Sequence, residues 1–133
     1  MKATVNWDGG LSFTGNTDSG YSTVMDGDGN AISPMESVLV AAGACSSVDV
    51  VEILKKGRFE LTGCQCELDA TRADEPPRVF TDIKAHYIVT GEGLTDKAVQ
   101  RAVALSAEKY CSVMLMLDGK VNISTSYEIK TPA

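Results

Sequence analysis

The sequence predicts a single α+β domain spanning residues 1–133, and three observations support this prediction. Apolar and polar residues alternate near both ends of the chain and in its middle, which is typical of half-buried strands. A long apolar segment between Ser33 and Lys56 has helix signals at both ends. A chain of 133 residues buries enough apolar surface to fold as one domain without disulfides or a metal. The expected order of elements is βββ-α-ββ-α-α-β.

The first part of the chain predicts three strands. Alternation of apolar and polar residues starts at Ala3, stops at a Gly-rich hairpin signal at 8–10 and resumes at 11–13. A third strand is expected at 21–25, followed by a flexible turn at 26–30. This turn lacks the acidic ligands and the closing Glu of a calcium loop, so we expect no metal site there.

The long central helix is expected to begin at Ser33 and Pro34. Ser33 supplies an N-cap hydroxyl, and Pro34 suits the first helical position. Glu36 lies three residues after Ser33, which completes a capping-box pattern. The helix is expected to end at Lys56, immediately before Gly57.

This helix also predicts a second subunit. From Val38 to Cys45 no side chain is charged or forms strong hydrogen bonds, and a helix that is apolar all round is buried on all sides. One chain of this length has little material to bury a helix so fully. We therefore expect sheets on both faces of the helix, partly from the partner in a homodimer.

The second half of the chain predicts a hairpin, two helices and a final strand. Thr95 is the expected N-cap of the first of these helices, which reaches Cys111 near its end. The expected ranges are 64–71 and 82–89 for the hairpin strands, 74–78 for their turn, 112–117 for the short last helix and 121–129 for the last strand.

Charge and hydropathy limit the function classes. The net charge of −6 argues against nucleic acid, because phosphate binding needs clustered Lys and Arg, and against an anionic membrane surface. The residues from Met1 to Trp7 do not resemble a secretory signal, and the longest strongly apolar run is too short to span a bilayer. We expect a cytoplasmic protein whose four cysteines are thiols rather than a disulfide framework.

Two cysteines in the predicted hairpin have a structural interpretation. Cys64 and Cys66 point to the same, apolar face of their strand, where free Cys behaves as a small hydrophobe. A metal site would need two more ligands, and His86 has the opposite parity in its own strand. His86, the only histidine, is therefore expected at the surface and not as a catalytic base.

The other two cysteines are the candidate reactive residues. Cys45 lies in the buried helix among small residues, which leaves room for a substrate or a second thiol. Cys111 lies where one helix ends and another begins, a position that favours a thiolate. Spacing alone leaves a packed core cysteine open as the alternative at both positions.

Together these segments resemble the OsmC/Ohr family of thiol peroxidases, and most closely its YhfA-like branch. The resemblance runs nearly end to end, includes the order of elements and has both motifs about the right distance apart. The residues on which it rests are Ser33-Pro34-Met35-Glu36, Ala41-Ala42-Gly43-Ala44-Cys45-Ser46, Asp49-Val50-Val51 and Glu108-Lys109-Tyr110-Cys111-Ser112-Val113.

The resemblance implies an intertwined α+β homodimer with the cysteine helix between two sheets. It also implies an antioxidant reaction without a cofactor: Cys45 attacks an organic hydroperoxide and becomes a sulfenic acid, Cys111 resolves it to a disulfide, and a dithiol reductant reopens the bond. These reaction steps agree with the known oxidation chemistry of thiols, in which a sulfenic acid condenses with a second thiol to a disulfide.

The activating groups depart from the family pattern. Family peroxidases use an Arg near the N-terminus, whereas the first Arg here is Arg58. Arg58, Arg78 and Lys109 are candidate substitutes, all of which a partner subunit could supply. Of two candidate supporting carboxylates, Glu36 is expected on the far side of the helix from Cys45, and Asp49 one turn beyond Cys45 on its own face.

This departure motivates a second hypothesis. The alternative to a peroxidase is a non-catalytic homodimer that binds a small hydrophobic or thiol ligand at the subunit interface.

Overall fold

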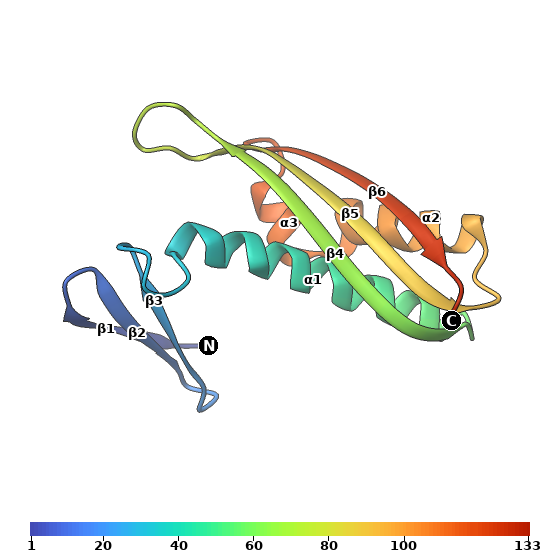
Figure 1. Ribbon diagram of the computed structural model, residues 1–133, viewed down its shortest axis with the longest axis horizontal. Coiled ribbons are helices and arrows are strands. Elements are labelled where there is room, and N and C mark those ends of the chain that lie inside the picture. The colour runs from blue at the N-terminus through green and yellow to red at the C-terminus, as the bar shows by residue number, and fades with distance from the viewer. The chain divides into compact units, whose positions relative to one another are not determined.

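The computed structural model describes residues 1–133 and contains six strands and three α-helices in the predicted order (Figure 1). The α+β class and the order βββ-α-ββ-α-α-β are confirmed, with one π-helical turn added between the last two helices. The chain divides into two compact units, Met1–Val40 and Ala41–Ala133.

The first unit contains an antiparallel sheet of β1 (Ala3–Gly9), β2 (Ser12–Thr17) and β3 (Ser22–Asp26), in that order. Trp7, Phe13 and Met25 lie opposite one another on the three strands and therefore share one face. Trp7 is nevertheless 68% exposed. This sheet presents apolar side chains that the single chain leaves uncovered.

Helix α1 (Pro34–Lys56) begins as the sequence predicts. The Ser33 hydroxyl accepts a hydrogen bond from the Glu36 N–H at 3.1 Å, and the Glu36 carboxylate accepts one from the Ser33 N–H at 2.9 Å. The end differs in detail, because the left-handed residue is Arg58 (φ 65°) and not Gly57. Gly57 instead avoids a tight contact, since a Cβ there would lie 3.0 Å from the Phe59 ring.

Helix α1 is buried along one side only. Its buried residues are Ala42, Gly43, Ser46, Val50 and Leu54, whereas Val40 and Val48 remain 55% and 56% exposed. By length and composition α1 could also cross a membrane, but core helices of soluble proteins pass the same test. The expected burial on all sides is therefore not reached within one chain.

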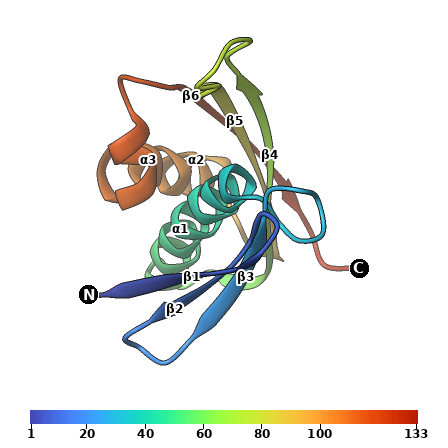
Figure 2. The ribbon, with the colours of Figure 1, turned by 90° about the vertical axis from the view of Figure 1, so that its left-hand side faces the viewer.

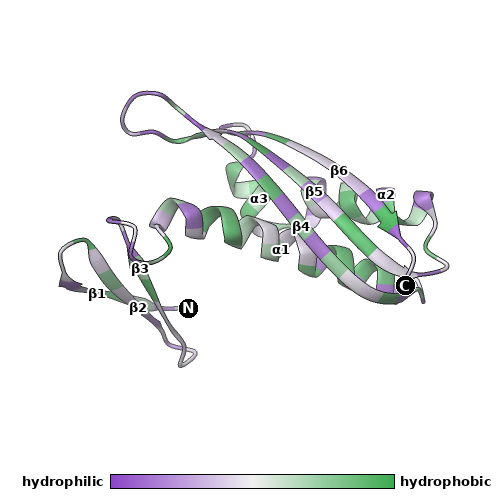
Figure 3. Ribbon diagram, in the orientation of Figure 1, coloured by the Kyte–Doolittle hydropathy of each residue, from purple (hydrophilic) through white to green (hydrophobic).

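The second unit has a sheet with the order β4-β5-β6. Strands β4 (Glu60–Arg72) and β5 (Phe80–Glu92) form the predicted hairpin and extend beyond the predicted ranges, and β6 (Asn122–Lys130) pairs parallel to β5. Bands of hydrophilic and hydrophobic residues alternate along β4 and β5 (Figure 3). The central strand β5 supplies the buried residues Ala85, Tyr87 and Val89.

Helices cover one face of this sheet (Figure 2). Helix α2 (Asp96–Leu105) has Thr95 as its N-cap, whose hydroxyl accepts from the Ala98 N–H at 3.2 Å. A π-helical turn, Ser106–Tyr110, follows without a break, and α3 (Ser112–Leu117) begins after Cys111. Part of α1 shares this face, and Gly43 allows it to lie close to β4: a Cβ at Gly43 would be 2.6 Å from Leu68 Cδ1.

Candidate thiol site

Cys45 lies near the middle of α1, at the edge of its buried side. Its side chain is partly exposed and packs against the hydrophobic core of the second unit. Cys45 carries a free thiol, as do the other three cysteines. A hydroperoxide from solution therefore has a more direct path to this sulfur than to a fully buried one.

Cys111 lies between the π-helical turn and α3 and is fully buried. Its N–H donates to the Ser106 carbonyl at 2.8 Å, which closes the π turn. Its sulfur accepts a hydrogen bond from the Met114 N–H at 3.4 Å, so that the thiol caps α3. The chain thus fixes both the backbone and the sulfur of this residue.

The structure brings the two candidate thiols next to each other. Burial, followed by the neighbouring Cys45 thiol, raises the pKa of Cys111 to about 11. Cys111 is therefore a neutral thiol at pH 7. A buried neutral thiol beside a more accessible one is an arrangement in which the two sulfurs have different reactivities.

Four polar side chains around Cys45 join three elements. The Tyr87 hydroxyl, on β5, donates to Ser46 Oγ at 2.6 Å, and Ser46 Oγ donates to the Gly43 carbonyl at 3.2 Å. The Ser106 hydroxyl contacts the Ser46 carbonyl at 2.9 Å and Asp49 Oδ2 at 3.0 Å. Sequence reasoning missed Ser46, Tyr87 and Ser106 as a group, because their contacts depend on how α1, β5 and the π turn pack together.

Asp49 lies on the face of α1 that is oriented toward the π turn. It lines a cavity of about 640 Å³ that also has two cations, Lys56 and Arg101. The apolar and aromatic part of the lining comes from Ile53, Leu105 and Tyr110. Asp49, one helical turn beyond Cys45, therefore lines a cavity whose walls include groups of both charges.

The second candidate carboxylate, Glu36, is engaged in capping α1. Its hydrogen bonds with Ser33 lower the pKa of this carboxyl. The structure therefore gives Glu36 a structural task.

The candidate cations are not ion-paired. Arg58 and Arg78 have left-handed backbones in loops, and Lys109 lies exposed on the π turn. The one ion pair of the chain joins His86 to Glu128.

Cys64 and Cys66 lie on the core side of β4, as their parity predicts, and are half-buried. Cys66 is directly opposite Tyr87 in the neighbouring strand. Burial raises the pKa of both thiols. Cys66 therefore lies beside Tyr87, and neither cysteine belongs to the pair formed by Cys45 and Cys111.

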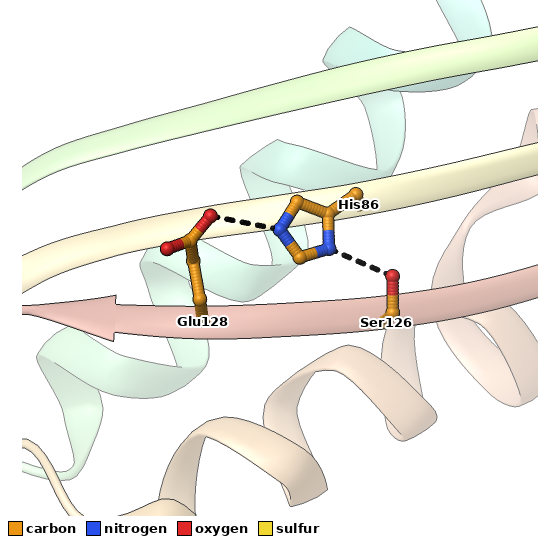
Figure 4. Close-up of polar contacts among 3 residues, drawn as sticks. All are labelled: His86, Ser126 and Glu128. Carbon is orange, nitrogen blue, oxygen red and sulfur yellow. Dashed lines mark hydrogen bonds and ion pairs between the residues drawn. The ribbon is translucent and has the colours of Figure 1, made fainter.

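His86 lies on the outer face of the sheet and has two partners that sequence reasoning did not identify (Figure 4). Nδ1 lies 2.7 Å from Ser126 Oγ, and Nε2 lies 3.0 Å from Glu128 Oε1. Both partners are on β6, some 40 residues away in sequence, so only the strand register reveals them. The His86 side chain is 34% exposed, as the sequence predicts for a surface residue.

The fold is that of an OsmC-like protein, and the chain belongs to this family: residues 27–126 match the model of the OsmC-like proteins. It is 55% identical to protein YhfA of Escherichia coli K12, over 97% of this chain and 98% of that protein.

Solved structures agree with this assignment. A hypothetical protein from Aquifex aeolicus VF5 has a TM-score of 0.91 at 32% identity, covering 99% of this chain and 97% of its own. An organic hydroperoxide resistance protein from Legionella pneumophila shares the fold at 18% identity, with a TM-score of 0.69 and coverage of 96% and 95%.

Proposed function

We propose that this protein reduces organic hydroperoxides with Cys45 and Cys111. The observation that supports the proposal is the proximity of these two thiols at the end of the π turn, in a chain of the OsmC family. The wider family theme agrees, since solved structures with this fold include proteins described as conferring organic hydroperoxide resistance.

The proposed reaction has three balanced steps. The Cys45 thiolate attacks the terminal peroxide oxygen, the O–O bond breaks, and the leaving alkoxide takes up a proton to give an alcohol and a sulfenic acid. The Cys111 thiol then condenses with this sulfenic acid to form a disulfide and water. A dithiol reductant finally reopens the disulfide by thiol exchange and is itself oxidised.

The different environments of the two thiols favour this assignment of roles. Cys45 is partly exposed, whereas Cys111 is fully buried and has a pKa of about 11. A thiol protonated at neutral pH is a poor first nucleophile, because the thiolate is the attacking species. Cys45 is therefore the peroxidatic residue and Cys111 the resolving one.

A homodimer is part of this proposal. The exposed side of α1 has the apolar residues Ala41, Ala44 and Val48, which are three or four positions apart and form one stripe next to Cys45. A second copy that covers this stripe would bury it and would set Cys45 at the subunit interface. We place the dimer in the cytoplasm, where a dithiol reductant is available to an antioxidant protein.

The direct test is turnover of cumene hydroperoxide and of hydrogen peroxide with dithiothreitol or a lipoyl protein as the reductant. The Cys45→Ser variant is the control, and the parent protein is expected to exceed it by at least about 100-fold. Thiol titration after one equivalent of hydroperoxide should show the loss of two thiols, and Cys111→Ser should abolish that paired loss. A parent protein no faster than Cys45→Ser would exclude the peroxidase function.

One observation favours a second candidate function, a homodimer that binds a small hydrophobic or thiol ligand without catalysis. No Arg occurs before Arg58, so the cation that the family peroxidases use is absent from its usual place. The turnover assay separates the two functions, because a binding protein would take up the ligand and leave the hydroperoxide intact.

A further inference from the structure

We propose that Ser106 is a positioning residue that holds Cys111 against Cys45 and thereby sets the rate of disulfide formation. This inference rests on the function proposed above. Ser106 is fully buried, although its side chain is polar, and it is the first residue of the π turn. Its carbonyl forms a hydrogen bond with the backbone of Cys111, and its hydroxyl forms hydrogen bonds with the part of α1 that contains Cys45.

The Ser106 carbonyl fixes the backbone of Cys111. It accepts the Cys111 N–H at 2.8 Å, five residues along the chain, which is the hydrogen bond that defines the π turn. Because Cys111 then leaves the helical conformation, its sulfur is free to cap α3 and to contact Cys45. Single π turns in helices are frequent at functional sites.

The Ser106 hydroxyl fixes the same turn to α1. Its single proton is shared between the Ser46 carbonyl at 2.9 Å and Asp49 Oδ2 at 3.0 Å. Ser46 follows Cys45 directly, and Asp49 lies one helical turn beyond it. One side chain therefore joins the segment that contains Cys111 to the segment that contains Cys45.

This arrangement acts on one step only. Attack of Cys45 on a hydroperoxide does not require Cys111, whereas condensation of the sulfenic acid with the second thiol requires both sulfurs in place. A displacement of about 1 Å in such a reaction can lower its rate by about 100-fold. Loss of the Ser106 hydroxyl should therefore slow disulfide formation and leave sulfenic acid formation nearly unchanged.

The test is a single-turnover experiment on reduced protein with one equivalent of cumene hydroperoxide. Dimedone traps the sulfenic acid, and intact mass measures the trapped adduct and the disulfide. In Ser106→Ala we expect disulfide formation to slow by about tenfold or more, with a matching rise in adduct. Ser106→Thr keeps the hydroxyl and should recover most of the parental rate.

A matched control is Ser112→Ala, on the other side of Cys111, where the side chain is exposed. This variant should behave like the parent protein. The thermal midpoint of each variant separates positioning from global destabilisation, because a merely structural loss lowers the midpoint without changing the ratio of adduct to disulfide.

A second measurement keeps the inference testable if the protein reduces no peroxide. The Cys45–Cys111 disulfide is equilibrated with a glutathione redox buffer, which needs no peroxidase activity. Ser106→Ala should lower the equilibrium constant for the disulfide by about tenfold, or about 30 mV for a two-electron couple. The inference would be overturned if Ser106→Ala had the same disulfide equilibrium constant as the parent protein. It would also be overturned if, in an active enzyme, this variant gave the same ratio of adduct to disulfide as the parent.

Discussion

At the scale of single residues, the proposed reaction assigns its second step to Cys111, and the protonation of this thiol should control the rate of that step. Its pKa of about 11 leaves only about one molecule in 10⁴ as thiolate at pH 7. If the thiolate is the attacking form, disulfide formation after peroxide addition should accelerate by about tenfold per pH unit from pH 7 to 9 and level off near the pKa. Single-turnover mass spectrometry across this range measures the slope.

The first step serves as the internal reference for this pH profile. Sulfenic acid formation in Cys111→Ser reports Cys45 alone and is measured over the same range. A disulfide step that does not change with pH would contradict the prediction and would indicate that a neighbouring group removes the Cys111 proton during the reaction.

Tyr87 illustrates how a buried hydroxyl stabilises the same region. Burial raises its pKa well above the usual value for tyrosine, so that it is a neutral donor to Ser46 at pH 7. Tyr87→Phe keeps the ring packing and removes this hydrogen bond, which should lower the free energy of unfolding by about 1 kcal/mol. Urea unfolding measures the difference.

The matched control for this change is Tyr110→Phe. Tyr110 is 54% exposed and lies on the π turn close to the same thiols. Its replacement should leave the unfolding free energy within about 0.5 kcal/mol of the parent. Equal losses in the two variants would show that the buried hydroxyl contributes nothing specific.

At the scale of elements, the sequence predicts those features whose signals are local. The capping box at Ser33 and Glu36 and the alternation along β4 and β5 come from neighbouring residues, and all are present in the structure. The π turn was not predicted, because residues 106–110 are equally compatible with a continuing α-helix. The structure shows tertiary contacts at this point, namely the buried hydrogen bonds of Ser106 to α1, which no local pattern specifies.

The partners of His86 were missed for a related reason. Parity alone predicts that His86 lies on the outer face of the sheet, and this is confirmed. Which side chains lie beside it depends on the parallel register that sets His86 opposite Ser126. No pattern within either strand specifies that register.

The capping box allows a stability prediction for α1. Ser33→Ala removes the hydroxyl that accepts a hydrogen bond from the Glu36 N–H. It also weakens the return hydrogen bond, in which the Ser33 N–H donates to the Glu36 carboxylate. The loss should be about 1 kcal/mol in the free energy of unfolding, measured with urea. Ser33→Asp retains an acceptor and should restore most of the stability, whereas a neutral effect of Ser33→Ala would show that the helix start does not contribute to global stability.

At the scale of the whole molecule, a single chain leaves large apolar side chains exposed to solvent on two of its surfaces. The sheet of the first unit leaves Trp7 exposed, and the stripe at Ala44 and Val48 on α1 is exposed as well. Both belong to elements that the sequence predicts as half-buried or fully buried. The proposed homodimer would cover these surfaces with a second copy of the chain.

The homodimer can be tested by introducing one charge into that stripe. Val48→Lys would bury an unpaired ammonium group at the interface, which costs several kcal/mol, so the dissociation constant should rise by about 100-fold or more. Sedimentation velocity from low to high micromolar protein should show a dimer for the parent and a monomer for this variant. Gln65→Lys adds the same charge on the outer face of β4 and should remain dimeric, and circular dichroism checks that both variants are folded. If the parent protein sediments as a monomer at a concentration on the order of 100 micromolar, the dimer is excluded. The placement of Cys45 at a subunit interface is then excluded as well.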